Sequence, residues 1–360
     1  MYRKPYKVQA VAHLLETTVD SVRRYIEESG IVVERQENGP RTRQFTLENI
    51  FDLAAWRQAN RPKTKIKKRG IATIYAPKGG VGKTTIAANI ACIFPLMGIK
   101  TLVIDLDFQA NLTLAFGYDS ELTAEEAPAM GLSKECVIEK HFGNLVPGWP
   151  YGRSALKDVI KTPYGENGPH LIPADLTLDR FDTILTYDAI EGKKSDLKIA
   201  ALIQEGMSGK NPEFDLTGYD LILFDAAPAK NRMTRGALLA SDFVISPVSM
   251  EKFSTKAISY LSSVLQDMRE DVGRSPELLV VGNFHTPNRL RVIHQMSVLT
   301  KEYPGSLLDH VIRRSEEFPK TLSEEDDLPP LALAKPTSDP SDELRAVAKA
   351  LLVKMGVVDA

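Results

Sequence analysis

The chain has 360 residues, which corresponds to about two domains at the usual size of roughly 150 residues each. Hydrophobic residues make up 43% of the chain and charged residues 26%, which excludes a disordered or fibrous protein. The net charge of −2 is unevenly divided, because residues 1–70 carry +7 and the remaining residues carry −9. A basic N-terminal part joined to an acidic remainder is typical of a nucleic-acid-binding module on a second domain.

Cysteine usage and hydropathy limit the chemistry and the location. Cys92 and Cys136 are far apart and neither lies in a CxxC motif, so a disulfide scaffold, a zinc ribbon and a cysteine-ligated cluster within one chain are excluded. No run of about 18 apolar residues occurs, and the first ten residues contain no apolar signal segment. We therefore expect a cytoplasmic protein without a membrane span.

The first 60 residues are predicted to form short helices. Apolar residues at helical spacing over 8–15 indicate the first helix, and Thr18 is suited to cap a second one that ends at Gly30. An Asn-Gly-Pro turn signal within residues 34–44 favours a β-hairpin or wing. A third helix is expected to begin near Thr46.

A basic segment follows the third predicted helix. Residues 61–70 read RPKTKIKKRG, with six basic residues in ten. They form either a solvated linker or a direct contact to phosphates, and both interpretations stay open. We predict a small basic domain over residues 1–60, this linker, and a second, larger domain over residues 71–360.

From residue 71 onward, strands and helices alternate. This alternation predicts an α/β protein in which helices flank a mostly parallel, twisted sheet. Residues 117–170 are richer in glycine and proline and are predicted to be a less regular insertion. The predicted strands are 71–75, 100–106, 219–224, 242–247 and 278–283, and a helix is predicted over 84–94, after the first of them.

A phosphate-binding loop is predicted directly after the first strand of this region, where the chain reads KGGVGKTT. The glycines let backbone N–H groups turn toward phosphate oxygens at the start of a helix. Lys83 is expected to lie between the β- and γ-phosphates of ATP, and the Thr84 hydroxyl is expected to bind Mg²⁺. The predicted nucleotide-binding residues are Gly79, Gly80, Val81, Gly82, Lys83, Thr84 and Thr85.

The lysine that opens this loop adds a family resemblance. Lys78 lies five residues before Lys83, and this pattern resembles the deviant Walker A motif of the ParA/MinD family. The resemblance implies a sandwich homodimer in which Lys78 reaches the nucleotide of the partner subunit. A cation supplied in this way would neutralise charge on the γ-phosphate. The candidate catalytic residues are Lys78, Lys83 and Asp107.

Two carboxylate motifs extend the resemblance. The sequence DLDFQ after the second predicted strand resembles switch I of the family, which implies that Asp107 orients the attacking water and Asp105 supports the Mg²⁺ shell. The sequence DAAP after the third resembles Walker B and switch II, which implies that Asp225 holds Mg²⁺ through water. Phe108 and Ala227 stand where the family has prolines, so the path of these loops stays open.

Weaker correspondences run through the rest of this region. The sequence LIPA at residues 171–174 and the sequence ISPV at residues 245–248 are similar to family motifs. Asn283 lies where relatives contact adenine, and the alternative is an ordinary polar residue at a strand end. Neither cysteine fits the cluster-binding pattern of the related nitrogenase iron protein.

The N-terminal part resembles the winged helix-turn-helix domain of the larger plasmid-type ParA proteins, and loosely a MerR-like module. The resemblance rests on Arg23-Arg24-Tyr25 in the second helix and on the RQFT sequence at the end of the predicted wing. Arg23 and Arg24 could enter the major groove of an operator, while Arg41 and Arg43 could hold phosphates. The alternative is a small helical dimerisation domain whose arginines form surface ion pairs.

Two C-terminal features bear on other surfaces. Arg289, with Arg291, Arg313 and Arg314, lies where relatives bind DNA non-specifically, although such a set can also be an ordinary solvated face. Binding there would weaken with salt, with a log–log slope of roughly −0.9 per phosphate. The helix predicted over residues 341–355 has three basic residues and no aromatic one, so we expect it to pack on the domain rather than on a membrane.

The resemblance implies a partition ATPase, with a DNA-binding domain over residues 1–60 and a P-loop ATPase domain over residues 71–360. ATP would drive formation of a dimer that binds DNA non-specifically on the nucleoid, and a centromere-binding, ParB-like partner would stimulate hydrolysis. The N-terminal domain would bind operator DNA and repress its own operon. Two alternatives stay open: a DNA-binding regulator in which the nucleotide is an allosteric ligand, and a ParA-like ATPase that positions another cargo.

Overall fold

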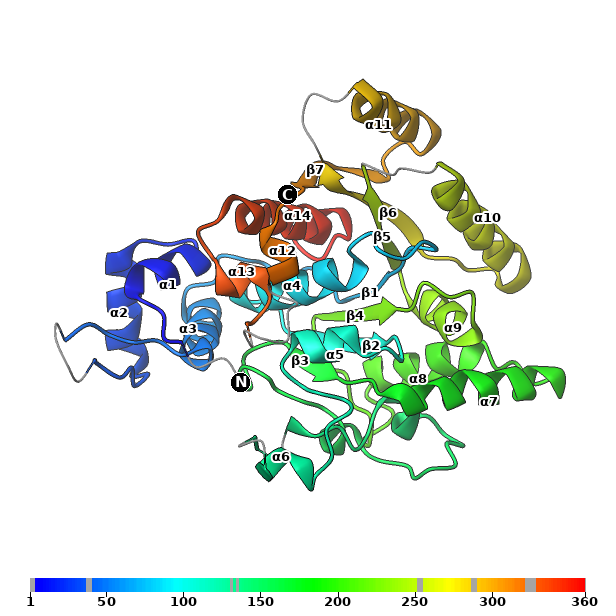
Figure 1. The fold of residues 1–360 in the computed structure, drawn as a ribbon, viewed down its shortest axis with the longest axis horizontal. Coiled ribbons are helices and arrows are strands. Elements are labelled where there is room, and N and C mark those ends of the chain that lie inside the picture. The colour runs from blue at the N-terminus through cyan, green and yellow to red at the C-terminus, as the bar shows by residue number, and fades with distance from the viewer. Residues whose placement is uncertain are drawn as a thin grey trace.

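A seven-stranded sheet forms the centre of the molecule, with helices on both faces and three N-terminal helices packed to one side (Figure 1). This computed structural model describes residues 4–36, 41–129, 132–133, 136–250, 255–285, 290–320 and 328–359. The strand order is β3-β2-β4-β1-β5-β6-β7, and each of the neighbouring pairs is parallel. The strands are β1 (Gly70–Ile74), β2 (Thr101–Leu106), β3 (His170–Ile172), β4 (Leu221–Ala226), β5 (Phe243–Ser249), β6 (Glu277–His285) and β7 (Leu307–Arg313).

The central strands are buried on both faces, which explains their almost continuous apolar sequences. Along β2, Leu102 and Ile104 pack into the cluster on one face of the sheet, whereas Val103 packs into the cluster on the other. The five predicted strands are confirmed as β1, β2, β4, β5 and β6. The two edge strands were not predicted, because β3 has three residues and β7 exposes Asp309 and His310 in its middle.

Two groups of helices cover the sheet. One face carries α4 (Lys83–Leu96), α13 (Leu331–Ala334) and α14 (Asp339–Lys354). The opposite face carries α7 (Asp179–Ile190), α8 (Leu197–Met207), α9 (Arg232–Ala240) and α10 (Thr255–Val272). The remaining helices are α5 (Asn111–Ala115), α6 (Glu126–Ala129), α11 (Leu290–Glu302) and α12 (Glu317–Lys320).

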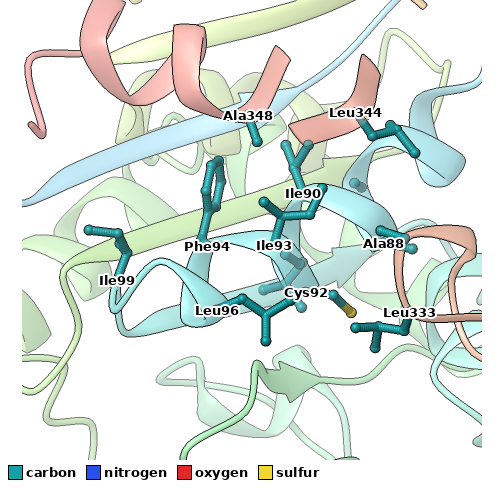
Figure 2. Close-up of a cluster of buried hydrophobic side chains, with 14 of the residues drawn as sticks. Ala88, Ile90, Cys92, Ile93, Phe94, Leu96, Ile99, Leu333, Leu344 and Ala348 are labelled. Atoms are coloured by element: carbon teal, nitrogen blue, oxygen red, sulfur yellow. The ribbon is translucent and has the colours of Figure 1, made fainter. Parts of the chain in front are cut away.

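Helix α4 is buried around almost its whole circumference, since 12 of its 14 residues are buried. A helix enclosed in this way is expected to be apolar on all sides rather than amphipathic. Figure 2 shows Ile90 and Phe94 of α4 near Leu344 and Ala348 of α14. The helix predicted over residues 84–94 is therefore confirmed, and it is a rigid support for the loop that precedes it.

The three N-terminal helices are α1 (Val8–Leu14), α2 (Val19–Ser29) and α3 (Leu47–Asn60). The Thr18 hydroxyl accepts a hydrogen bond of 3.1 Å from Ser21 N at the start of α2, and Gly30 ends that helix with a φ of +70°. Thr46 and Asn49 form a reciprocal capping box at the start of α3. These helix limits confirm those predicted from the capping residues.

Short antiparallel pairings join the segments between these helices. Gln36 N donates to Thr42 O at 2.9 Å and Gln44 N donates to Glu34 O at 2.8 Å, so two extended segments lie side by side as a hairpin requires. The predicted Asn-Gly-Pro turn lies outside the described residues. The pairing supports the predicted hairpin, and the assignment of this unit as a winged helix-turn-helix stays a prediction.

We call residues 4–60 the head and residues 70–359 the body. Apolar side chains of the head and of the α4/α14 face belong to one continuous hydrophobic cluster. Tyr6 Oη donates to Leu333 O at 2.9 Å, and the rings of Phe51 and Tyr164 stack with centroids 5.9 Å apart. The head is therefore packed firmly on the body, while the domain limits at residues 60 and 70 stay predictions.

The C-terminal helix α14 packs on the body, as predicted. Its apolar face, which includes Leu344, Val347 and Leu351, is fully buried against α4 and the sheet. Among the described residues, no helix is long and apolar enough to cross a membrane. The region predicted as an irregular insertion, residues 117–170, contains α6 and two single turns of 3₁₀ helix, Phe142–Leu145 and Leu156–Asp158, and ends where β3 begins.

Candidate phosphate and metal site

The loop between β1 and α4 has the backbone geometry that its glycines predict. Gly80 and Gly82 adopt φ values of +69° and +85°, and residues that have a Cβ rarely adopt such values. A Cβ on Gly82 would also lie 2.3 Å from the Asn283 amide nitrogen. These two requirements explain why the loop needs glycine here, and α4 begins directly after it at Lys83.

Lys83 is a buried cation at the start of α4, with only 8% of its surface exposed. Burial lowers the pKa of its ammonium group, and the nearby carboxylates Asp225 and Asp107 act in the opposite direction. The structure therefore brings together three predicted site residues from three separate segments of the chain. A lysine held in this position can meet a phosphate with little reorganisation.

Asp225 lies near the end of β4, where the register places it beside Ile74 of β1 and Asp105 of β2. Burial raises its pKa well above the usual range, and the neighbouring charge of Asp105 adds to this effect. Thr84 and Lys83 favour the charged form to a smaller extent. Neither carboxylate oxygen of Asp225 has a hydrogen-bond partner among the described residues.

An orphaned buried carboxylate next to a hydroxyl fits a magnesium site. Mg²⁺ is commonly held by one or two protein oxygens, with phosphate and water oxygens completing its shell. Asp225 and Thr84 supply such oxygens at one end of the phosphate loop. Among the described residues, no group of three or more His, Cys, Asp or Glu side chains is placed so that it could hold a metal ion.

Asp105 is fully buried and both of its oxygens are already hydrogen-bonded. Oδ1 accepts from Asp107 N at 3.0 Å, and Oδ2 accepts from Thr113 N at 3.0 Å and from Thr113 Oγ1 at 2.8 Å. Burial raises its pKa to about 7, although these hydrogen bonds act against the rise. Asp105 therefore holds the following loop in place, and its support of a metal stays a prediction.

Thr113 is a site residue that the sequence did not reveal. It is fully buried, and besides binding Asp105 its hydroxyl oxygen accepts a hydrogen bond of 2.9 Å from Ala174 N. It thus joins the loop after β2 to Ala174, the last residue of the LIPA sequence, just after β3. No local pattern distinguishes this threonine from any other residue of the short helix α5, so only the tertiary structure identifies it.

The loop after β2 forms a tight turn around Asp107. Gln109 N donates to the Asp107 carboxylate at 3.1 Å, and Ala110 N donates to Asp107 O at 2.8 Å. Phe108, which replaces a proline of the resembled motif, packs partly buried against the cluster under α7 and α8. The turn forms without the proline and leaves Asp107 9% exposed, near Lys83.

The other predicted nucleotide-site residues lie on the phosphate loop, on the first turn of α4 and at the end of β6. Lys78 and Gly79 are exposed on the loop, whereas the Val81 side chain is buried. The Asn283 amide donates to Val81 O at 2.8 Å, so in this structure it supports the phosphate loop. Thr85 follows Thr84 in the first turn of α4. The predicted contact of Asn283 with adenine stays a prediction.

The predicted DNA-binding arginines of the head are on its surface. Arg23 and Arg24 are exposed on α2, and Arg23 pairs with Asp20 at 3.0 Å. Arg41 and Arg43 lie on one extended segment of the hairpin, with Arg43 partly buried. Their exposure is compatible both with DNA contact and with the alternative of surface ion pairs.

The arginines predicted for the body are placed less favourably. Arg289 lies outside the described residues. Arg313 forms an ion pair with Glu343, and its backbone N–H donates to the same carboxylate at 2.8 Å. For Arg313 the alternative of an ordinary solvated ion pair therefore describes the structure better.

The comparison with protein families finds the AAA domain over residues 69–278, which is more than half of the chain. The cell division protein PomZ of Myxococcus xanthus is 25% identical over 77% of this chain and 76% of its own length. The chromosome-partitioning ATPase Soj of Thermus thermophilus is 26% identical over 61% of this chain and 69% of its own length. The family match includes the phosphate loop and strands β1, β2 and β4.

Solved structures share the fold. A plasmid partition protein of Borrelia burgdorferi, bound to AMPPNP, has a TM-score of 0.58 and 21% identity, covering 80% of this chain and all of the other. Cobyrinic acid a,c-diamide synthase of Mycobacterium smegmatis, bound to an ATP analogue and magnesium, has a TM-score of 0.59 and 17% identity, covering 80% and 95%. At these identities the likeness establishes the fold alone.

Proposed function

Since the chain belongs to the AAA-domain family and is related to ParA-type partition and positioning ATPases, we propose that it is a DNA-partition ATPase that uses ATP and Mg²⁺. The observation that carries this proposal is the meeting of Lys83, Asp107 and Asp225 at the carboxyl ends of three neighbouring parallel strands. Ligands of open α/β sheets bind at this edge. Lys78 is the first residue of the same loop. This additional lysine distinguishes the proposed enzyme from nucleotide-binding proteins whose phosphate loop has only the second lysine.

The chain's own residues divide the work of hydrolysis. Backbone N–H groups of residues 79–85 and the ammonium group of Lys83 bind the β- and γ-phosphates. Thr84 and Asp225 hold Mg²⁺, and Asp105 fixes the loop on which Asp107 lies. Mg²⁺, when bound, neutralises charge on the phosphates. Asp107 orients the attacking water.

Lys78 completes the site of a second copy in this proposal. Two molecules bind face to face when both hold ATP, and each Lys78 contacts the γ-phosphate of the partner. A cation brought in by the partner stabilises charge in the transition state in the same way as an arginine finger. Hydrolysis then separates the dimer, so that dimer lifetime is set by turnover.

The DNA contacts of the proposal have two parts. The head acts as a winged helix-turn-helix that binds operator DNA through Arg23 and Arg24, with Arg41 and Arg43 on phosphates. The dimeric body binds DNA non-specifically, through a local basic patch that includes Arg289, because its overall charge is negative. The protein is cytoplasmic and bound to the nucleoid. A centromere-binding, ParB-like partner accelerates ATP hydrolysis, and hydrolysis releases the protein from the DNA.

The substitution Lys78→Gln tests the mechanism. We expect the variant to bind ATP normally but to lose hydrolysis and ATP-dependent dimerisation, because the proposed contact across the dimer is removed. Turnover, nucleotide affinity and dimer mass would be measured with DNA and the partner present. Lys210→Gln is the matched control. Lys210 is exposed in the connection from α8 to the amino end of β4, whereas the phosphate loop lies at the carboxyl ends of the strands. Normal turnover in Lys78→Gln would reject the mechanism.

A second candidate is a positioning ATPase for another cargo, because PomZ, a cell division protein, is among the relatives. Hydrolysis in that case would respond to a cargo protein rather than to a centromere-binding partner. A nucleotide-regulated transcriptional regulator would instead give sequence-specific footprints that differ between ADP and ATP, without partner-dependent turnover. Footprinting and stimulated turnover, measured on the same preparation, distinguish the three functions.

A further inference from the structure

A cavity of about 230 Å³ lies at the junction of the head and the body, away from the phosphate loop. We call it the junction cavity. Its apolar lining comes from the end of α1, the end of α4 and α13. The lining residues are Leu14, Leu15, Glu16, Arg57, Lys63, Thr64, Ile93, Leu96, Met97, Ala332, Arg345 and Lys349.

Four cations line the junction cavity, but only one carboxylate does, that of Glu16. Lys349 Nζ donates to Glu16 Oε1 at 2.6 Å, which neutralises one of the four. Lys63 Nζ donates instead to the backbone carbonyl of Glu16 at 3.2 Å. A carbonyl oxygen satisfies a hydrogen bond without cancelling the positive charge, so the cavity keeps an excess of positive charge.

Arg57 and Arg345 are the two buried cations of this wall, 5% and 6% exposed. Arg57 donates to Leu96 O at 2.9 Å and also to Leu15 O, which are again neutral acceptors. Burial lowers the pKa of Arg57, and the charge of Glu16 only partly offsets this effect. A further negative charge in the cavity would stabilise the guanidinium.

Arg345 provides an unsatisfied donor. Its Nη2 donates to Pro336 O at 2.7 Å and to Asp342. Its Nη1 is buried and has no hydrogen-bond partner among the described residues. A buried, unpaired donor is costly, and a guanidinium can bind a carboxylate or a phosphate through two nitrogens.

We propose that the junction cavity binds a small organic anion, with a carboxylate or phosphate group toward these cations and a compact apolar part against α4. The size supports a small ligand, because pockets for drug-sized molecules usually hold about 300–1,000 Å³ and this one holds about 230 Å³. The apolar part would lie against Leu14, Ile93 and Leu96. Figure 2 shows Leu96 at the end of α4, the helix that begins at the phosphate loop.

The location connects such a ligand to both parts of the protein. The cavity lies between α1 and α3 of the head and α4 and α14 of the body, so an occupant contacts all of these parts at once. A ligand that binds only this docked arrangement stabilises it by mass action. The anion therefore fixes the head on the body and slows its local opening.

Binding of phenyl phosphate and of benzoate, measured by calorimetry on the full chain, tests the proposal. Excess ADP and Mg²⁺ are present so that the phosphate loop is filled. We expect saturable binding that weakens about tenfold in Lys63→Met, because one charge-assisted contact is lost. Lys63 is exposed and its loss should not impair folding. Lys210→Met, an exposed lysine elsewhere, should bind as the unaltered protein does.

Two further measurements complete the test. Benzyl alcohol, which has the ring but no charge, should bind much more weakly than benzoate. Hydrogen exchange in α1 and α3 should slow when the anion is bound. Equal affinities in Lys63→Met and Lys210→Met, equal affinities for benzoate and benzyl alcohol, or no saturable binding would each overturn the proposal. None of these outcomes bears on ATP hydrolysis, so the partition ATPase is tested separately.

Discussion

The phosphate site and the junction cavity both bury charge, but with opposite sign. At the phosphate site two carboxylates, Asp107 and Asp225, lie near one buried lysine, Lys83, and Asp105 lies beside Asp225 in the sheet. At the junction cavity the guanidinium group of Arg57 lies against two backbone carbonyls, and that of Arg345 contacts one carbonyl and Asp342. The first region is therefore rich in buried acidic groups, and the second in buried basic groups.

This difference shows how the partner of a buried charge decides what a site can accept. Oxygens of Asp225 without partners leave room for a cation, which in turn attracts phosphates. Carbonyl partners at the junction satisfy donors of Arg57 but leave its charge in place, which suits an anion. Substitutions that remove one charge at a time measure whether the two regions differ in this way.

The largest effect is expected from Asp225→Asn. Turnover should fall by about 100-fold or more, because the loss of a metal-binding carboxylate removes several kcal/mol of charge stabilisation. The nucleotide-free protein should nevertheless become more stable to urea, since a buried carboxylate without partners is replaced by a neutral group. Steady-state hydrolysis and urea unfolding measure the two effects. In the exposed control Asp158→Asn, both should stay unchanged.

A loss of both activity and stability in Asp225→Asn would contradict the description of this site. It would mean that Asp225 forms hydrogen bonds that hold the empty site together. Loss of activity with a gain of stability is the pattern that an electrostatic site predicts, because such a site stores unfavourable charge for its ligand.

The next largest effect is expected at the junction. Arg57→Met should lower the free energy of unfolding by about 2–4 kcal/mol, because it leaves the buried carbonyls of Leu15 and Leu96 without their donor. Urea unfolding measures the loss, and hydrogen exchange shows whether α1 and α3 open first. A change below about 0.5 kcal/mol, typical of surface positions, would show that the head does not depend on this contact.

The sequence was sufficient to predict the sheet interior and the phosphate loop, because both depend on local patterns. Buried strands such as β4 read as continuous apolar runs, and the loop needs glycine at positions where φ is positive. The edge strands β3 and β7 were missed, because one is very short and the other is interrupted by polar residues. Edge strands carry a weaker sequence signal than buried ones.

The roles of Asp105 and Thr113, and the packing of the head on the body, depend on contacts between distant residues. Asp105 was expected beside the metal, and only the fold shows that its oxygens are bound by Asp107 and Thr113. Arg57 had no distinguishing neighbours in the sequence, yet it joins α1 to the end of α4. Long-range partners of single polar residues have no periodic signal, so no sequence pattern predicts them.

The pH dependence of stability distinguishes the carboxylates from the guanidinium groups. Burial raises the pKa of Asp105 to about 7, whereas in the unfolded chain it lies near 3.9. Between about pH 4 and pH 7 the folded state therefore keeps a proton that the unfolded state has lost, and stability falls as pH rises. The slope from this one group is at most about 1.4 kcal/mol per pH unit.

The substitution Asp105→Asn should reduce this slope in the nucleotide-free protein. The variant will be less stable overall, because an amide cannot accept all the hydrogen bonds that Asp107 and Thr113 donate. The slope of unfolding free energy against pH separates the two effects. An unchanged slope would show that Asp105 does not titrate in this range, whereas Arg57→Met should leave the slope as it is.

The smallest effect is expected from Arg61→Met, at the same end of α3 as Arg57. Arg61 pairs with Glu28 at 2.7 Å, but the two side chains are 42% and 37% exposed, so solvent screens the pair. The loss of unfolding free energy should be about 0.2–1 kcal/mol and should shrink further at high salt. The larger loss in Arg57→Met should persist at high salt, because it arises from buried carbonyls rather than from an ion pair. If Arg61→Met lost as much unfolding free energy as Arg57→Met, burial would not explain the difference between the contributions of the two arginines to stability.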